Sequence, residues 1–450
     1  MSYNSIMREL GVRLDERAVK GKKVLIALSG GADSVCLMHL LAQKRDEYGM
    51  RLCAAHYHHG IRGDDADGDL EFCRTQAEME GIPFYSERGD VPRYAREHGL
   101  GLESAAREMR YDFLERTRRS TGCDVIALAH HADDNAETVL MHILRGTGLK
   151  GLRGMPAVSG TLVRPLLGCG KKDILAYLER NGYSWREDAT NREPDNPRNI
   201  LRLEAMPALE RAYPGCRDSL NRLALACAAD DAFLDRLTDG YMRSAHVRGP
   251  YGDRLDISAC PDEAILMRAV RRCVGAEVYY DSLMRVLDIC RGEGVSVTVA
   301  KDIEARAEKG RLYLLRPFIP PREVPLELNG VTVLPGICTV EAAPAPNVPV
   351  RNDPFTQVLD PDALRGAVLR TRRAGDRMHP WGMTGSQSLG DRMTDRKIPL
   401  CERDTLPLIA VGSEVIWAPG CGISHTARIT ETTGKSVKLH INTEGDTHAQ

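Results

Sequence analysis

Hydrophobic and polar positions follow two alternating patterns in the first 200 or so residues of the chain. Apolar runs at 24–28, 52–57 and 125–129 have the length of buried parallel strands, and 84–88 is a further candidate strand. Between these runs, apolar side chains recur at helical spacing, as over 35–42 and 102–119. Strands that alternate with helices predict a doubly wound α/β domain with a parallel sheet.

The rest of the chain has different patterns. A hairpin is expected over 155–165, and a helix over 171–181 that Gly182 ends. Helical patterns predominate from Pro207 to about Arg316, and a loop rich in Pro and Ala over 341–349 indicates a linker. Short strands are expected at 367–370, 408–411, 415–418 and 427–430. The predicted domains are 1–206 (α/β), 207–320 (helical), 321–358 (linker with short strands) and 359–450 (β-rich).

The loop between the first strand and its helix reads Ser-Gly-Gly-Ala-Asp-Ser, residues 29–34. Its two glycines leave successive N–H groups free to face one anion at the helix N-terminus, which predicts a phosphate-binding loop. The Walker loop G-x-x-x-x-G-K-S/T requires a lysine that is absent here. The alternative is an ordinary turn in which Ser29 or Asp33 caps the helix.

Polar clusters also follow the second and fourth predicted strands. Residues 56–59 read His-Tyr-His-His, and residues 130–137 read His-His-Ala-Asp-Asp-Asn-Ala-Glu. In open parallel sheets ligands collect at the carboxyl ends of strands. A histidine metal site at 56–59 is disfavoured, because no further ligand stands at suitable spacing. Asp134 and Glu137 share one helix face, and helix capping accounts for one of these carboxylates but not both.

Composition narrows the choice of function. The hydrophobic share of 42% and charged share of 28% are ordinary for a cytosolic protein, and neither a membrane-spanning run nor a signal-peptide core is apparent. The 13 cysteines are scattered without any C-x-x-C, so they indicate no disulfide framework and no zinc site. The formal charge of -2 means that any RNA binding must come from local basic surface.

One such basic surface is expected near the C-terminus. Between residues 370 and 403 eight cations face four acids. A small β-rich module with this charge suits contact with a phosphate backbone, and a merely solvated surface is the alternative. Arg107 and Arg110, in the helix at 102–119, are surface charges by default.

Several motifs together resemble the tRNA(Ile)-lysidine synthetase family, a branch of the ATP pyrophosphatases. The matching stretches, in the order of that family, are SGGADS, HYHHGIRG, LESAAREMRYDFL, ALAHHADDNAETVLMHILRGTGLKGLRGM, RPLL, WREDATN, RN-x-x-R-x-E-x-x-P and LRTRRAGDRMHPWGM through DRKIPLCERDTLPLIAVGSEVIWAPG. SGG-x-DS alone indicates only an ATP pyrophosphatase, whereas HHADD-x-AET together with LRG-x-G-x-x-G-L is typical of a much narrower group. Leu203 departs from the pattern, since relatives often have histidine there.

The resemblance implies a cytoplasmic enzyme that attaches free L-lysine to the wobble cytidine of tRNA(Ile) with a CAU anticodon. ATP and Mg2+ would be required, and the tRNA would contact the middle and C-terminal domains. ATP would first adenylate the cytosine oxygen and release pyrophosphate, after which the lysine amine displaces AMP. The oligomeric state is left open, with a homodimer as one expectation.

The resemblance also implies roles for individual residues. Asp33, Arg110, His130 and Arg202 would be catalytic; Ala27, Ser29, Gly30, Gly31, Asp33, Ser34 and His56 would bind ATP; Asp134 and Glu137 would bind lysine; Asp33 would hold Mg2+; and Arg370, Arg372, Arg373, Arg377 and Arg396 would bind tRNA.

Two other functions fit parts of the sequence. A related ATP pyrophosphatase that adenylates a tRNA base for thiolation would generally need paired cysteines, which are absent. A tRNA-binding protein without catalytic activity would be expected to have lost Asp33, Asp134 or Glu137, all of which are present.

Overall fold

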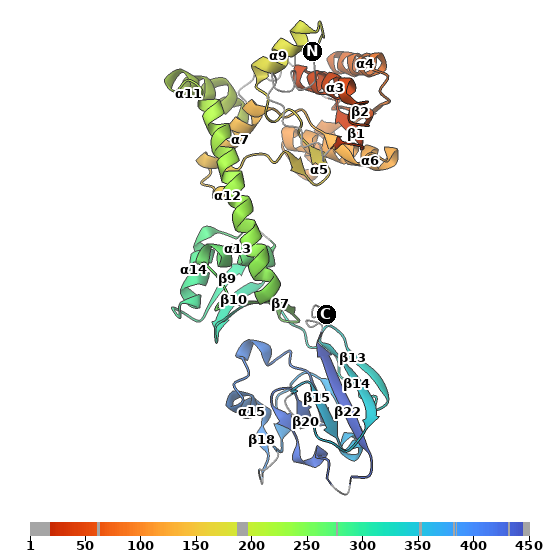
Figure 1. Ribbon diagram of the computed structural model, residues 1–450, viewed down its shortest axis with the longest axis vertical. Helices are drawn as coiled ribbons and strands as arrows, with labels where there is room; N and C mark the ends of the chain where they lie inside the picture. The colour runs from red at the N-terminus through yellow and green to blue at the C-terminus, as the bar shows by residue number, and fades with distance from the viewer. Residues whose placement is uncertain are drawn as a thin grey trace. The chain divides into compact units, whose positions relative to one another are not determined.

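The computed structural model describes residues 19–60, 64–186, 197–275, 278–350, 353–380, 383, 385–430 and 433–443. The chain divides into two compact units, residues 1–232 and 233–450, each with its own architecture (Figure 1). Parts of the matched motifs lie outside the described residues, namely 61–63, 187–191 and 381–382. Among the described residues, no helix is both long and apolar enough to cross a membrane.

The first unit contains a six-stranded sheet in the order β3-β2-β1-β4-β6-β5. The five strands from β3 to β6 in this order are parallel, and β5 is an antiparallel edge strand. The parallel sheet expected from the sequence is therefore confirmed. The strands are β1 (Lys23–Ala27), β2 (Arg51–His58), β3 (Phe84–Arg88), β4 (Val125–Ala127), β5 (Val158–Ser159) and β6 (Leu162–Val163).

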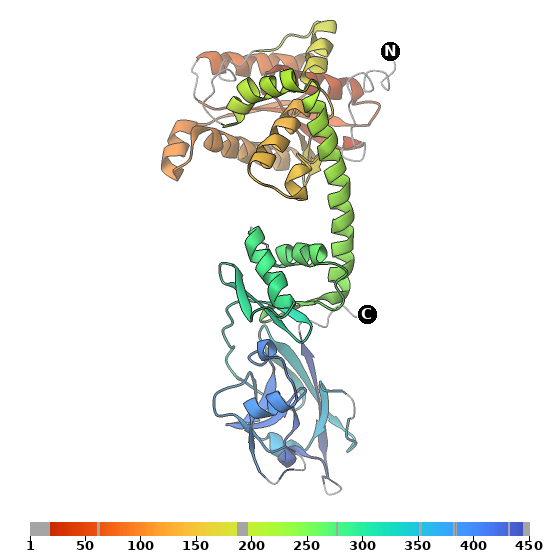
Figure 2. The same cartoon turned by 90° about the vertical axis from the view of Figure 1, so that its left-hand side faces the viewer.

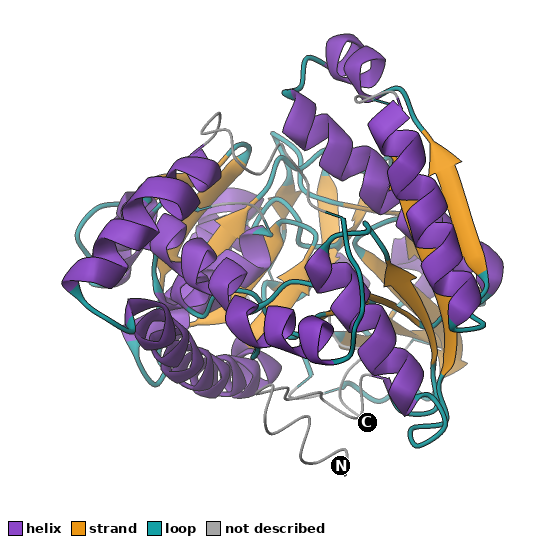
Figure 3. Cartoon of the chain, turned by 90° about the horizontal axis from the view of Figure 1, so that it is seen from above, coloured by secondary structure: helices purple, strands orange, loops and turns teal. Residues whose placement is uncertain are grey.

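Helices cover both faces of this sheet, which explains why β1 is apolar from Val24 to Ala27. Val24 and Ile26 of β1 pack into the core beneath α3 (Ala32–Lys44), α4 (Asp64–Met79) and α9 (Lys171–Arg180). Leu25 points the opposite way, into the core beneath α5 (Val91–His98) and α6 (Leu102–Thr121). In the view of Figure 3, helices (purple) lie over the strands (orange).

The strand order creates a switch point beside β1. The chain moves from β1 outward to β2 and β3, then returns to place β4 on the other side of β1. The connections after β1 and β4 therefore leave in opposite directions, and a crevice opens where the two carboxyl ends meet. The loop at 28–31 and the segment at 128–131 border this crevice.

Further helices complete the surroundings of the crevice, and all of them lie in the first unit except α12, whose residues after Ala232 belong to the second. They are α7 (Ala132–Leu144), α8 (Leu149–Leu152), α10 (Pro197–Ile200), the π-helical turn η2 (Leu201–Ala205), α11 (Met206–Ala212) and the long α12 (Cys216–Ala245), seen in green in Figure 2. Asn221 of α12 donates to the carbonyl oxygen of Ala132 at 3.0 Å and accepts from Asn135 at 2.8 Å. These bonds fix the first turn of α7, which carries the acidic residues of the site.

The second unit begins with a five-stranded antiparallel sheet in the order β7-β8-β11-β10-β9. Helices α13 (Glu263–Val274) and α14 (Tyr280–Cys290) share its hydrophobic core. The helices of the middle region were expected, but this sheet was not, because charged residues interrupt its strands and mask their apolar alternation. The strands are β7 (His246–Gly249), β8 (Gly252–Asp256), β9 (Ser296–Ala300), β10 (Ile303–Glu308) and β11 (Arg311–Leu315).

The C-terminal part is β-rich, as expected, and has two sheets around a core that includes Leu369, Trp417 and Leu439. The segment 321–358 is more than a linker, since its strand β14 (Cys338–Ala345) pairs with β22 (Ser436–Thr443). The strand expected over 427–430 is wrong: residues 425–427 form a 3-10 turn. The other elements are β12 (Val324–Pro325), β13 (Gly330–Leu334), β15 (Thr356–Leu359), β16 (Val368–Arg370), β17 (Arg377–Met378), β18 (Gln387–Ser388), α15 (Leu389–Asp395), β19 (Leu408–Val411), β20 (Glu414–Ala418) and β21 (Gly422–Ile423).

Candidate active site

The loop after β1 is built to approach an anion closely. Gly30 has a φ of +88°, and a Cβ there would lie 3.2 Å from the Sγ of Cys73. Ser34 ties the loop together, because its hydroxyl donates to the carbonyl oxygen of Gly31 at 2.9 Å and accepts from the backbone N–H of Ser29 at 3.1 Å. Gly31 is the N-cap of α3 and offers no side-chain cap, so the alternative of an ordinary capped turn is wrong. The first N–H groups of α3 remain available to a phosphate.

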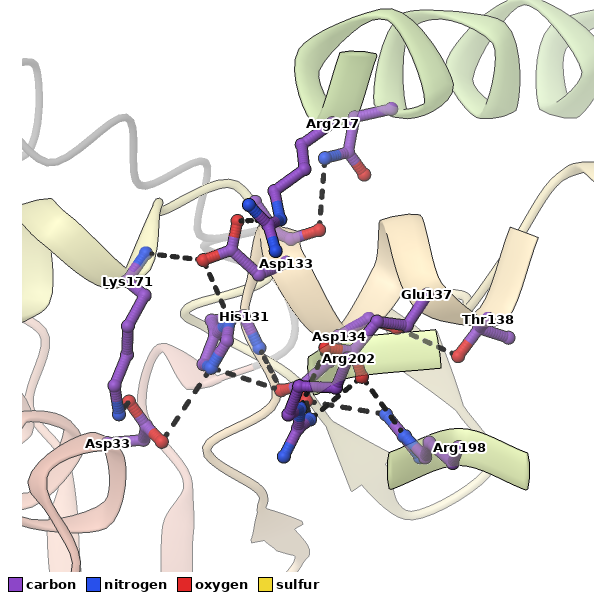
Figure 4. A network of polar contacts seen from close by, with 12 residues as sticks. Asp33, His131, Asp133, Asp134, Glu137, Thr138, Lys171, Arg198, Arg202 and Arg217 are labelled. Atoms are coloured by element: carbon purple, nitrogen blue, oxygen red, sulfur yellow. Dashed lines mark hydrogen bonds and ion pairs between the residues drawn. The ribbon is translucent and has the colours of Figure 1, made fainter. Parts of the chain in front are cut away.

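Asp33, in the first turn of α3, joins this loop to the segment after β4. Its Oδ1 accepts a hydrogen bond from Lys171 Nζ at 2.6 Å, and its Oδ2 lies 3.7 Å from Nε2 of His131 (Figure 4). Lys171 also donates its backbone N–H to Asp133 at 3.0 Å. The start of α9 thus brings a lysine to a phosphate-binding loop whose own sequence contains none.

Asp134 and Glu137 point to the same side of α7, as their spacing predicts, and two arginines bind both of them (Figure 4). Arg202 donates to Glu137 Oε1, Glu137 Oε2 and Asp134 Oδ1, each at 2.8 Å. Arg198 donates to the same two carboxylates at 3.3 Å. Glu137 is only 2% exposed, so these bonds supply the counter-charge that a buried carboxylate requires.

The ion pairs of this group favour the ionised forms of its members. Burial by itself would raise the pKa of Asp134, but His131, Arg198 and Arg202 together hold that pKa below its ordinary value. The hydrogen bonds to Glu137 raise the pKa of Arg202. Both carboxylates were expected to bind the ammonium group of the substrate lysine. In this structure they are hydrogen-bonded to arginines instead.

Three other predicted residues lie along the crevice. His56 is buried at the end of β2, and its Nδ1–H donates to the carbonyl oxygen of Leu28 at 2.9 Å. Burial lowers the pKa of His56, and it lowers the pKa of His130 to about 4, so both imidazoles are neutral near pH 7. Arg110 of α6 is a charge neighbour of His130, and its Nε is buried. The default view of Arg110 as a surface charge is therefore wrong.

The structure adds residues that the sequence patterns did not assign to the site. Lys171, Asp133, Arg198 and Arg217 all belong to the network in Figure 4, and Arg217 Nε lies 3.6 Å from Asp133 Oδ1. Arg198 had a detectable signal, because it stands four residues before Arg202 on the same helical face. Lys171 is 138 residues from Asp33 in the sequence, and no local pattern indicated that the two residues meet.

The donor set at the loop fits Mg2+, which prefers carboxylate and phosphate oxygens and keeps several waters. Asp33 Oδ2 is the oxygen not bound to Lys171, so it can serve as a ligand beside the loop. Elsewhere among the described residues, His246, Asp253 and Cys273 place ligand atoms within 4.8 Å of one another. Asp253 is already bound to His246 at 2.9 Å and lies 3.6 Å from Arg316, which explains that cluster as an ion-pair group.

The C-terminal arginines divide into one buried residue and four on or near the surface. Arg370 is 1% exposed and binds Asp376 through both terminal nitrogens, at 2.8 and 2.7 Å. Its predicted role in tRNA contact is therefore corrected: Arg370 stabilises the domain. The other four predicted arginines keep at least part of their side chains accessible, with Arg372 bound to Asp404, Arg373 to Glu323, Arg377 to Ser386, and Arg396 exposed.

Comparisons with known proteins match most of the chain. A family model described as the PP-loop domain matches residues 3–209, and one described as the TilS substrate C-terminal domain matches residues 367–440. The tRNA(Ile)-lysidine synthase of Clostridium tetani is 31% identical over 445 residues, which cover 94% of this chain and 95% of that relative. The chain belongs to the tRNA(Ile)-lysidine synthase family.

A second member of the tRNA(Ile)-lysidine synthase family, from Symbiobacterium thermophilum, is 33% identical over 438 residues, which cover 89% of this chain and 90% of the relative. Among solved structures, the U34-tRNA thiolase NcsA from Methanococcus maripaludis matches with a TM-score of 0.41 and 21% identity, covering 50% of this chain and 77% of that one. Membership identifies the protein as an enzyme with a PP-loop ATP-binding domain.

The pair Arg370–Asp376 generates a stability prediction for the C-terminal domain. Arg370→Met leaves the Asp376 carboxylate buried without its partner, so the free energy of unfolding of this domain should fall by about 3 to 5 kcal/mol. The matched control is Arg372→Ala, which removes a more accessible ion pair with Asp404 and should cost about 1 kcal/mol or less. Urea unfolding followed by Trp417 fluorescence, in proteins whose Trp185 and Trp381 are replaced by Phe, measures both, and equal losses would contradict the structural role of Arg370.

Proposed function

We propose that the protein ligates L-lysine to C2 of the wobble cytidine of tRNA(Ile) with a CAU anticodon, at the expense of ATP. One observation supports this most directly: the PP-loop and the Asp134–Glu137 pair meet at one crevice, in a chain that belongs to the tRNA(Ile)-lysidine synthase family over nearly its whole length. The crevice therefore offers one place for phosphates and another for a charged amino acid.

The first step would be adenylation of the tRNA. The cytosine O2 attacks the α-phosphorus of ATP, the bond between the α-phosphorus and the bridging oxygen breaks, and pyrophosphate leaves. The N–H groups of residues 29–34 and Lys171 are the groups that would hold the departing pyrophosphate. Mg2+ bound through Asp33 would neutralise phosphate charge. Arg110 would serve at the α-phosphate.

The second step would transfer lysine. Its side-chain amine attacks C2, the C2–O2 bond breaks, and AMP leaves with the oxygen. The amine has a reference pKa near 10.4 and must first lose a proton. His130, with its low pKa, is a weak base in the ligand-free protein, and an arriving phosphate would raise that pKa because negative charge favours the imidazolium form. A nearby carboxylate is the alternative acceptor.

The proposed lysine contacts at Asp134 and Glu137 require a rearrangement. Both carboxylates are bound by Arg198 and Arg202, so an ammonium group could approach them only if a guanidinium group moved away. Arg202 lies in a π-helical turn, a geometry that often marks functional sites. Movement of this turn would free the carboxylates and release Arg202 towards a phosphate.

Thiolation of a tRNA base is a weaker candidate on physical grounds. Cys36 and Cys73 are buried cysteines near the PP-loop, one in α3 and one packed against Gly30. Burial raises the pKa of both thiols, to about 12 for Cys73, so they are protonated at neutral pH. A nucleophilic cysteine needs a lowered pKa.

The function is tested by lysine incorporation. Purified protein with ATP and labelled lysine should modify a transcript of tRNA(Ile) bearing CAU, and should leave the same transcript bearing UAU at background. The proposed reaction modifies cytosine at the wobble position, and the UAU transcript has uracil at that position instead. Equal labelling of both transcripts, or labelling of neither, would refute the proposal.

The role of Asp33 is tested in the first half-reaction alone. Asp33→Asn keeps the shape of the side chain but loses the charge that binds Mg2+ and Lys171, so pyrophosphate release that depends on tRNA should fall by about 100-fold or more. Asp173→Asn alters an exposed aspartate in the first turn of α9 and is the matched control. Release at the wild-type rate by Asp33→Asn would remove Asp33 from the metal site.

The proposed tRNA contact of the C-terminal domain predicts a change in salt dependence. Replacing Arg372, Arg373 and Arg396 by Ala should weaken tRNA binding, and the slope of log affinity against log salt should become shallower by about 0.7 to 0.9 for each phosphate that is no longer neutralised. Arg365→Ala is the control, since Arg365 is exposed and lies outside the predicted set. If the slope of the triple variant equals that of wild type, this surface does not contact the tRNA.

A further inference from the structure

Several buried polar atoms near the crevice have no hydrogen-bond partner among the described residues, and four of them belong to neighbouring side chains on one side of it. These four are Nε of Arg110, the hydroxyl of Tyr111, Nδ1 of His130 and Nε of Arg164. Arg110 and Tyr111 come from α6, whereas His130 and Arg164 follow β4 and β6. Because β4 and β6 are adjacent and parallel, their carboxyl ends bring His130 and Arg164 to the same edge of the sheet.

These residues form one electrostatic group. The guanidinium carbon of Arg110 lies 5.4 Å from the centre of the Tyr111 ring, and the charges of Arg110 and Arg164 both act on His130. Burial lowers the pKa of Arg110 and of Arg164, and the neighbouring charge of Arg107 lowers both further. Several positive charges therefore lie close together in a partly buried region. Their mutual repulsion and desolvation are unfavourable, and a bound anion would offset that free-energy cost.

The described acidic residues of the site do not supply that anion. Asp33 is bound by Lys171, Asp133 by Lys171 and Arg217, and Asp134 and Glu137 by Arg198 and Arg202. Among the described residues, Arg164 Nη1 donates to the carbonyl oxygen of Pro156 at 2.8 Å, and its Nε has no hydrogen-bond partner. An oxyanion carried by a ligand would satisfy the group.

Two substrates of the proposed reaction carry oxyanions, the phosphates of ATP and the carboxylate of lysine. In the proposed reaction the phosphates already have the N–H groups of the PP-loop, Lys171 and Arg110. A planar carboxylate matches the fork of Nε and Nη atoms that a guanidinium presents. The charges of Asp134, Arg110 and Arg164 all act on His130, so the acidic pair and the arginines border the same histidine.

We propose that Arg164, together with Tyr111, binds the α-carboxylate of the substrate lysine and so selects a free amino acid over a simple amine. This inference rests on the proposed lysine ligation. Arg164 is a specificity-determining residue in this scheme, since the carboxylate takes no part in bond making.

The test compares lysine with cadaverine, which has the same side-chain amine and lacks the carboxylate. For wild-type protein with the CAU transcript, kcat/KM for lysine should greatly exceed that for cadaverine. In Arg164→Ala this preference should fall by about 10- to 100-fold, the share of a charge-assisted bidentate contact, through a raised KM for lysine. Arg164→Lys keeps the charge without the fork and should retain part of the preference.

Controls separate the possible failures. Arg119→Ala removes an exposed arginine of α6 that is paired with Glu115 at 2.7 Å, away from the proposed carboxylate site, and its lysine preference should match wild type. Circular dichroism checks that each variant is folded. Pyrophosphate release measured without lysine tests the other source of the oxyanion: a fall in Arg164→Ala that matches its loss of lysine use assigns the group to ATP and overturns the inference.

Two further results are distinguishable. If wild-type protein incorporates lysine and Arg164→Ala keeps the full preference for lysine over cadaverine, the carboxylate site is wrong while the proposed function stands. If wild-type protein incorporates no lysine into the CAU transcript, the proposed function itself fails.

Discussion

The buried contact of Asp134 and Glu137 with Arg198 and Arg202 is the interaction on which the site depends, because it places two negative charges where water cannot solvate them. Each carboxylate needs a cation, and both cations come from a segment more than 60 residues later in the chain. The helices α10 and η2 are therefore tied to α7 by charge. The same contact decides whether an incoming ammonium group can reach the acids.

The parallel sheet makes this contact possible. Its switch point brings the ends of β1 and β4 to one crevice, so that the anion-binding start of α3 and the acidic start of α7 lie side by side. His131 links the two, with Nε2 at 3.7 Å from Asp33 and 3.4 Å from Asp134. A change of charge at the phosphate loop is thereby felt by the acidic pair.

The distribution of paired and unpaired charges indicates a division of labour within the crevice. Asp33 and Lys171 form a pair at the phosphate loop, and the acids of α7 are neutralised by arginines. Arg110 and Arg164 remain without an acidic partner among the described residues. A site that binds a nucleotide and an amino acid needs both kinds of charge. Paired charges stabilise the fold, and unpaired charges are available to bind the ligand.

Elements that depend on local pattern could be predicted without any structure. The apolar run at 24–28, the glycines of the loop and the spacing of Asp134 and Glu137 are local, so the strand, the phosphate loop and the shared helix face followed from them. Which charges meet could be learned only from the folded chain. Lys171 reaches Asp33 across 138 residues, and Arg370 turns inward to Asp376 although its neighbours indicated a basic surface. Pairing and burial arise from the packing of segments that are distant in the sequence, so the periodicity of residues along the chain cannot predict them.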